Sequence, residues 1–170
     1  MKFQIIGYSG AGKSTLAKFL ATYYAIPRLH LDTVRFLPQW QERPDEDMKA
    51  LVDNFLDQHN SWVIDGNYSF CSYARRMEEA DTIIFMDFSP WNCLYRAFKR
   101  FLHYRGKNRE DMAPGCTEKL DWTFIRWILK DGRQERQKKR YHKICQTYPD
   151  KIKILRNQKE LEQFMKTVTG

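Results

Sequence analysis

The residues best suited to chemistry form a glycine-rich turn near the N-terminus. Residues 7–14 read Gly-Tyr-Ser-Gly-Ala-Gly-Lys-Ser, which fits the pattern G-x-x-x-x-G-K-[ST] at every fixed position. Glycines let the backbone curl so that successive N–H groups point inward at phosphate oxygens. An apolar run, 3–6, precedes the turn and a helical pattern, 14–24, follows it, so the positive end of a helix dipole would face the same pocket. Pattern and context together predict a phosphate-binding loop.

The side chains of this loop have expected roles. We expect Lys13 to reach the β- and γ-phosphates of a nucleoside triphosphate and the Ser14 hydroxyl to ligate magnesium. The predicted ligands are therefore ATP and Mg²⁺, and Lys13 is also a predicted catalytic residue. The predicted nucleotide-binding residues are Gly7, Ser9, Gly10, Ala11, Gly12, Lys13, Ser14 and Thr15.

Two further groups could act on the phosphates. Asp65 ends a short apolar run, so its carboxylate could hold a metal-bound water near Ser14; the alternative is an N-cap on the turn that follows. Arg96 and Arg100 lie four residues apart in a helical pattern, so both could point into one pocket. Positioned guanidinium groups stabilise the charge of a transferring phosphoryl group, whereas the alternative is a solvated basic face.

The elements that position these residues alternate between strands and helices. Strands in that arrangement pair in parallel, which predicts an α/β fold: a three-layer α/β/α sandwich around a five-stranded parallel sheet. We expect one domain over residues 1–170, with Trp91, Trp122 and Trp127 in its core. The predicted strands are Phe3–Ile6, Arg28–Leu31, Trp62–Ile64, Thr82–Met86 and Lys151–Leu155, and the predicted helices are Ser14–Tyr24, Pro44–His59, Pro90–His103, Leu120–Leu129 and Gln134–Cys145.

One stretch, Arg105–Asp121, interrupts the alternation. It holds two glycines, a proline and many charges, with no sustained periodicity. Because a loop of this length in a compact domain is usually functional, we expect a lid at about residues 103–122. Arg105 and Arg109 could reach a ligand from it, but an exposed basic loop explains them equally well.

Charge and composition restrict the partners. The net charge is +8, and it is uneven: residues 1–95 carry 9 Lys and Arg against 12 Asp and Glu, whereas residues 96–156 carry 18 against 7. The basic half should bind a polyanion, either a phosphate ligand or a nucleic acid. No apolar run approaches the roughly 20 residues that span a bilayer, and the N-terminus does not resemble a signal peptide, so we expect a cytoplasmic protein without membrane contact.

Several segments resemble the adenylate-kinase-like P-loop kinases. His30–Arg35 contains D-x-x-R after the second predicted strand, Trp62–Tyr68 ends in Asp-Gly-Asn-Tyr, and Arg96 and Arg100 stand before the lid. The chain most closely resembles the bacterial DNA topology modulation (FlaR-related) proteins, whose lid signature is similar to Arg109–Glu118. The resemblance covers nearly all 170 residues and implies a fold like that of the nucleoside monophosphate kinases.

The resemblance also implies a site for a phosphoryl acceptor, formed by Asp32, Arg35, Asp65 and Gly66. If the acceptor is a monophosphate, Arg35 would hold its phosphate. If it is a hydroxyl compound, as in shikimate- or gluconate-kinase-like enzymes, Asp32 could position or deprotonate the hydroxyl, which makes Asp32 a predicted catalytic residue. Trp40 could stack on a base or cover the core. Both kinds of acceptor stay open.

Two functions follow from the sequence. The first is an ATP-dependent phosphotransferase of a small, nucleotide-like acceptor, since the phosphate loop and the acidic and basic residues above serve that reaction. The second is a nucleotide-dependent protein that binds DNA or modulates its topology, which the basic half and the narrower resemblance favour. No helix-turn-helix, RNP or zinc motif is present, so a nucleic-acid partner is the weaker expectation.

Overall fold

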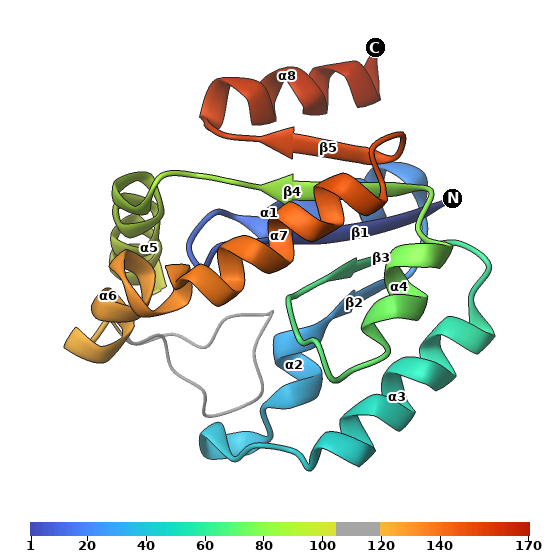
Figure 1. Cartoon of the computed structure of the whole chain (residues 1–170), viewed down its shortest axis with the longest axis horizontal. Coiled ribbons are helices and arrows are strands. Elements are labelled where there is room, and N and C mark those ends of the chain that lie inside the picture. The colour runs from blue at the N-terminus through green and yellow to red at the C-terminus, as the bar shows by residue number, and fades with distance from the viewer. Residues whose placement is uncertain (105–119) are drawn as a thin grey trace.

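The computed structural model describes residues 1–104 and 120–170, and its central element is a parallel β-sheet (Figure 1). Within those residues the sheet has five strands in the order β2-β3-β1-β4-β5, and all four pairings are parallel. The predicted strands are all present, and no end differs from the prediction by more than one residue. Their bounds are Lys2–Gly7 (β1), Arg28–His30 (β2), Trp62–Asp65 (β3), Thr82–Met86 (β4) and Ile152–Leu155 (β5).

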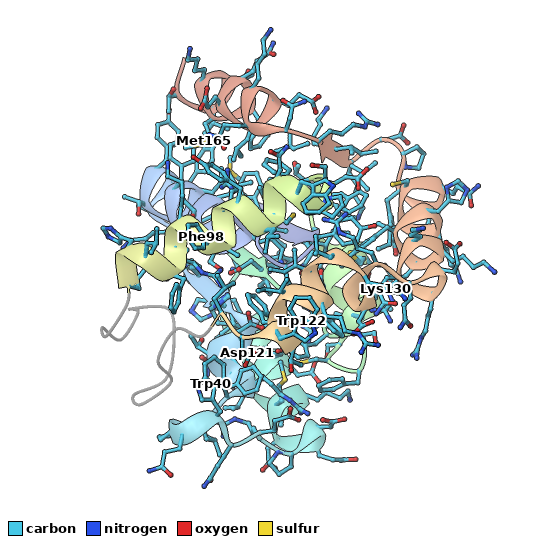
Figure 2. The ribbon with its side chains drawn as sticks, turned by 90° about the vertical axis from the view of Figure 1, so that its left-hand side faces the viewer. Trp40, Phe98, Asp121, Trp122, Lys130 and Met165 are labelled. Carbon is cyan, nitrogen blue, oxygen red and sulfur yellow. The ribbon has the colours of Figure 1, made fainter. Side chains whose placement is uncertain are left out.

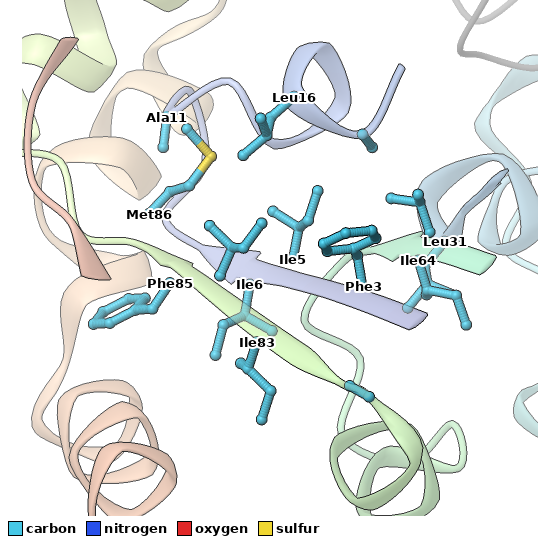
Figure 3. Close-up of a cluster of buried hydrophobic side chains, with 14 of the residues drawn as sticks. Phe3, Ile5, Ile6, Ala11, Leu16, Leu31, Ile64, Ile83, Phe85 and Met86 are labelled. Carbon is cyan, nitrogen blue, oxygen red and sulfur yellow. The ribbon is translucent and has the colours of Figure 1, made fainter. Parts of the chain in front are cut away.

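Helices cover both faces of this sheet. Figure 3 shows α1 on one side of β1, and α4 and α7 on the other. The three-layer α/β/α sandwich predicted from the sequence is therefore confirmed. The helices in the described residues are α1 (Lys13–Tyr24), α2 (Leu31–Arg35), α3 (Asp45–Gln58), α4 (Tyr73–Glu79), α5 (Pro90–Tyr104), α6 (Trp122–Leu129), α7 (Glu135–Thr147) and α8 (Gln158–Thr169), with short 3₁₀ turns at Pro38–Trp40 (η1) and Asp131–Arg133 (η2).

The core lies on both faces of the central strands. Phe3 and Ile5 point toward α1, while Ile6 points to the opposite face (Figure 3), and all three are buried. On the first face the ring of Phe3 stacks on Tyr24, with centroids 5.5 Å apart. Burial on both faces explains why these strands read as continuous apolar runs and not as alternating patterns. The site residues follow the carboxyl ends of these strands.

Three helices were not predicted. Leu31 was expected to end the second strand but begins the short helix α2, and α4 and α8 were not identified. Both α4, with seven residues, and α2, with five, are too short to show helical periodicity. In α8 Leu161 is buried, and Phe164, Met165 and Val168 pack partly buried against the core. These positions follow helical spacing, so the sequence did carry the signal of this helix and the prediction overlooked it.

The predicted burial of three tryptophans is wrong. Trp91, Trp122 and Trp127 are 70%, 77% and 44% exposed. In α5 the buried positions are the small residues Cys93 and Ala97, so the helix turns its larger side chains outward. Figure 2 shows Phe98 of the same helix on the outer surface. The spacing of apolar residues correctly predicted a helix at α5, but it did not predict which face of that helix packs on the core.

The lid and the absence of membrane contact were also expected from the sequence. Most of the lid expected at 103–122, including Arg105 and Arg109, lies outside the described residues; within it α5 extends to Tyr104 and α6 begins at Trp122. In the part of the chain that the structure describes, no helix has both the length and the apolar character needed to cross a membrane.

Candidate functional site

The glycine-rich loop connects β1 to α1 and has the backbone conformation that its sequence requires. Gly10 and Gly12 have φ angles of 82° and 99°, a left-handed region that L side chains rarely adopt. A Cβ on Gly10 would lie 2.5 Å from the backbone oxygen of Cys93, and a Cβ on Gly12 would lie 2.3 Å from Arg96 Nη2. Only glycine therefore fits at these two positions, where the loop packs against α5. A loop of bare backbone before a helix is suited to binding phosphates.

Polar side chains hold this loop in place. The Asn67 amide donates to the carbonyl oxygen of Gly7 at 2.7 Å and accepts from the Gly7 N–H at 3.1 Å. Lys13 Nζ donates to the carbonyl oxygens of Gly7 and Tyr8, at 3.0 and 3.1 Å. Trp127 Nε1 donates to Ser9 Oγ at 3.1 Å. The loop is thus tied to the segment after β3 and to α6.

The Lys13 side chain is half-buried at the cavity, and partial loss of its hydration lowers the pKa of the ammonium. The negative charges of Asp32 and Asp65 oppose that shift, so both carboxylates act on this ammonium. Lys13 is therefore the group that links the phosphate loop to the acidic residues after β2 and β3.

A cavity of about 1370 Å³ opens at the carboxyl ends of the strands, the end of the sheet that faces the viewer in Figure 2. Parallel α/β sheets characteristically bind ligands in this place. Of the predicted nucleotide-binding residues, Gly7 and Ala11 lie behind the loop surface and do not line the cavity, and Ala11 is fully buried. The others line it directly: Ser9, Gly10, Gly12, Lys13, Ser14 and Thr15.

The arginine pair of α5 faces the same cavity as the loop. Arg96 and Arg100 both line it. The Arg96 guanidinium donates to Gln158 at the start of α8 and lies 5.2 Å from the ring centroid of Phe88, and burial lowers its pKa. Arg100 lies 6.0 Å from the ring centroid of Phe124 on α6. The structure thus brings this predicted pair beside the loop, with aromatic rings behind both guanidinium groups.

Asp32, on the first turn of α2, stands at another part of the cavity. Its Oδ1 accepts a hydrogen bond of 2.8 Å from the phenol of Tyr68, and its Oδ2 lies 3.6 Å from His30 Nε2. Burial, and then the charge of Asp32, raise the pKa of Tyr68, so this phenol stays protonated and donates. Asp32, Gly66 and Tyr68 all line the cavity.

Asp65 is placed differently from Asp32. Its side chain is fully buried and is not part of the cavity lining. One oxygen, Oδ2, lies 2.8 Å from His30 Nδ1, while the other, Oδ1, is buried without a hydrogen-bond partner. The unpaired Oδ1 leaves Asp65 free to accept a hydrogen bond from a water, but its predicted place beside a metal-bound water stays a prediction.

Magnesium fits this site only with help from the ligand. In residues 1–104 and 120–170 no three His, Cys, Asp or Glu side chains gather in a way that could hold a metal ion. Ser14 lines the cavity and can supply one hydroxyl oxygen. A magnesium ion here would take most of its remaining ligands from phosphate oxygens and water, as is usual for this ion.

Arg35, predicted to hold an acceptor phosphate, is not brought into the cavity lining. Its guanidinium pairs with Glu42 and, at 2.5 Å, with Asp45, and it donates to the carbonyl oxygen of Arg43 at 2.8 Å. Its side chain is 15% exposed. These contacts occupy the guanidinium within the segment that joins α2 to α3.

Sequence reasoning missed some residues that shape the site. Tyr68 directly follows the Asp-Gly-Asn segment, so its position carried a usable signal. Arg76 gave none: it is fully buried on α4 and donates to the carbonyl oxygens of Tyr68 and Cys71, at 2.6 and 2.9 Å, and to Gln4 Oε1 at 3.1 Å. Arg76 thereby fixes the loop that presents Tyr68.

The fold agrees with solved structures of low sequence identity. Shikimate kinase from Acinetobacter baumannii, determined in complex with shikimate, superposes with a TM-score of 0.63 at 15% identity, covering 99% of this chain and 90% of that one. The chain therefore has the same overall fold as that shikimate kinase. An uncharacterised protein from Eubacterium ventriosum superposes with a TM-score of 0.54 at 18% identity, over 100% of this chain and 99% of the other. No protein-family model matches the sequence, and neither does any curated protein.

Proposed function

We propose that this protein is an ATP-dependent kinase that transfers the γ-phosphoryl group to a small acceptor of nucleoside or nucleotide type. One observation carries the proposal: a single cavity is lined by the glycine-rich loop, with Lys13, and by the carboxylate of Asp32. Donor and acceptor can therefore be held in one space, and positioning and charge stabilisation supply most of the catalysis in phosphoryl transfer.

The loop and the arginine pair would act on the donor. Backbone N–H groups of the loop would bind the phosphates, and Lys13 would leave the carbonyl oxygens of Gly7 and Tyr8 for the β- and γ-phosphates. Magnesium, when bound, neutralises phosphate charge and orients the γ-phosphate; Ser14 would be a ligand, and Asp65 would order its water. Arg96 and Arg100 would stabilise the negative charge that spreads over the phosphoryl oxygens.

Asp32 would act on the acceptor. Tyr68 already donates to the Oδ1 of Asp32, so we assign the hydrogen bond from the acceptor to Oδ2, which lies 3.6 Å from His30 Nε2 and keeps acceptor capacity. The shikimate kinase with the same fold was solved with shikimate bound, which is consistent with a small acceptor but does not identify it.

The first experiment measures binding and transfer together. Calorimetry with Mg²⁺ and a non-hydrolysable ATP analogue should give a Kd that rises about 100-fold or more in Lys13→Ala, because the variant loses a charged contact to the phosphates. Lys18→Ala, an exposed lysine on the same helix, is the matched control and should bind as the parent does. Tight ATP binding without transfer of labelled phosphate to any nucleoside, nucleotide or hydroxy acid would refute the kinase assignment.

A second candidate function comes from α7 and from the narrower resemblance to the DNA topology modulation proteins. Arg136, Lys139 and Lys143 lie exposed on this helix at a spacing that places them near one another. That basic face supports a nucleotide-dependent DNA-binding protein. If these basic side chains bind the phosphate backbone of DNA, the affinity should fall steeply between 50 and 200 mM salt. A salt titration of DNA affinity, with and without ATP, tests this candidate.

A further inference from the structure

We infer that the acceptor is a flat-ringed alcohol without a phosphate group, of the nucleoside class, and that Trp40 and the carboxylates of Asp32 and Glu42 select it. The inference rests on the proposed kinase function and names its substrate. It differs from the monophosphate acceptor that the adenylate-kinase resemblance implies. Its basis is the segment between α2 and α3, which forms the cavity wall beside Asp32.

The charge of this wall disfavours a phosphate. Asp32 on α2 and Glu42 in the segment both line the cavity, and their side chains are 45% and 59% exposed. The two nearby arginines are held elsewhere: Arg35 pairs with Glu42 and Asp45, and Arg43 Nε donates to the carbonyl oxygen of Val34 at 2.8 Å. A monophosphate at this wall would meet Asp32 and Glu42, and like charges at short range repel. Arg35 offsets part of the Glu42 charge. Cationic lining residues such as Arg96 and Arg100 lie on α5 beside the phosphate loop and not on this wall.

The remaining lining of the wall is aromatic. Phe36 and Trp40 pack edge to face, with ring centroids 5.2 Å apart, and both line the cavity. Tyr68 and Phe70 line it as well and pack 5.8 Å apart. Aromatic side chains stack on flat heterocycles, and this stacking depends little on which base is bound. A base or a similar ring therefore matches this wall better than a small aliphatic acid does.

The backbone that presents Trp40 is strained. Gln39 and Trp40 both have φ of 62°, and the left-handed region is uncommon for residues with a Cβ. Such strain persists where the surrounding structure enforces it, and it concentrates at ligand sites. In addition, Trp40 Nε1 is buried without a hydrogen-bond acceptor. Figure 2 shows Trp40 at the carboxyl end of the sheet, where it lines the cavity.

Asp32 completes the reaction for a hydroxyl acceptor. The acceptor hydroxyl would donate its hydrogen bond to Asp32 Oδ2, and its oxygen would attack the γ-phosphorus. The bond from the γ-phosphorus to the β–γ bridging oxygen breaks, ADP leaves with that electron pair, and the hydroxyl proton passes to Asp32 and then to solvent. Tyr68, which donates to Oδ1, keeps the carboxylate turned toward the acceptor.

The deciding experiment compares matched acceptors. The full chain is incubated with labelled ATP, Mg²⁺ and each of a set of ribo- and deoxynucleosides, and separately with the corresponding 5′-monophosphates and with small hydroxy acids. We expect transfer to at least one nucleoside, with kcat/KM at least tenfold above that of its monophosphate. Equal or faster transfer to the monophosphate, or transfer to hydroxy acids alone, would overturn the inference while the kinase assignment stands. No transfer to any acceptor would refute the kinase assignment instead.

Substitutions then test the wall itself. Trp40→Leu should raise the KM of the nucleoside about tenfold, since one stacking contact is lost, while the KM of ATP stays the same. Trp91→Leu removes a tryptophan that is exposed outside the cavity lining and should change neither constant. An unchanged nucleoside KM in folded Trp40→Leu would overturn the assignment of Trp40.

Glu42→Gln serves as an independent test if Trp40→Leu does not fold. This substitution removes the ion pair between Glu42 and the Arg35 guanidinium, and with it one negative charge from the wall. Turnover of monophosphates should then rise relative to nucleosides. If the ratio of the two kcat/KM values does not change, carboxylate repulsion does not select the acceptor.

Discussion

The two ends of the cavity are built from different parts of the chain. The donor end is mainly backbone: one continuous loop whose glycines at 10 and 12 have left-handed φ angles, with Lys13 and Ser14 at its end. The acceptor end is mainly side chains from segments far apart in sequence, such as Asp32 on α2 and Tyr68 after β3, which are 36 residues apart. Local sequence therefore specifies the first end, and tertiary packing specifies the second.

This difference has a functional consequence. A backbone loop binds what all nucleoside triphosphates share, namely a chain of phosphates, and tolerates little change. A wall of side chains such as Phe36, Trp40 and Glu42 can change one residue at a time without disturbing the sheet. Under the proposed function, specificity would reside in the acceptor end, and substitutions at the two ends should separate the kinetic constants of donor and acceptor.

The largest effect is expected at the donor end. In Gly10→Ala the new Cβ would meet the backbone oxygen of Cys93 at 2.5 Å and would hold an L residue at φ of 82°, so we expect a loss of about 2–4 kcal/mol in the free energy of unfolding. Urea denaturation and ATP titration check this. The converse change, Ala25→Gly, relieves a φ of 52° at the C-cap of α1 and should leave ATP affinity unaltered; equal behaviour of the two variants would contradict the account.

A smaller loss of stability, of a different kind, is expected for Arg76→Met. Removal of this buried guanidinium leaves Gln4 and two backbone carbonyl oxygens without their donor, which should lower the free energy of unfolding by about 2–3 kcal/mol. Since Arg76 holds the loop that carries Tyr68, the KM of the acceptor should rise while that of ATP stays constant. The control is Arg75→Met on the same helix, whose ion pairs lie at the surface and contribute about 1 kcal/mol or less.

The smallest effect is expected for Tyr68→Phe. The variant keeps the ring and loses one hydrogen bond to Asp32, which should lower kcat/KM for the acceptor three- to tenfold, as expected for about 1 kcal/mol. Because burial and Asp32 raise the pKa of this phenol, it stays protonated up to pH 10, and the parent should show no loss of acceptor binding from its ionisation below that pH. A step below pH 10 that disappears in Tyr68→Phe, but not in Tyr23→Phe, would contradict the assignment.

The donor end and the sheet could be predicted from sequence because their determinants are contiguous. The residues from Gly7 to Thr15 form one motif between one strand and one helix, and each strand is a short apolar run. The same locality explains the failures. Nothing near Trp91 in the sequence indicates that Cys93 and Ala97 occupy the core side of α5.

The acceptor end could be predicted only in part. Asp32 was identified from its D-x-x-R spacing, and the structure places it in the cavity. The same spacing suggested that Arg35 would face a ligand, but its guanidinium pairs with Glu42 and Asp45, seven and ten residues away. The ion pairs of Arg35 depend on how the segment after α2 folds back on that helix. No local sequence pattern predicts this fold.

The separation of the two ends is tested most directly by Asp32→Asn. The variant keeps the size of the side chain and removes its charge, so it cannot take a proton from the acceptor. We predict that the Kd for the ATP analogue with Mg²⁺ stays within about twofold of the parent value, while transfer to the best acceptor falls about 100- to 10,000-fold. Unchanged transfer, or a loss of ATP affinity as large as the loss of transfer, would contradict the account.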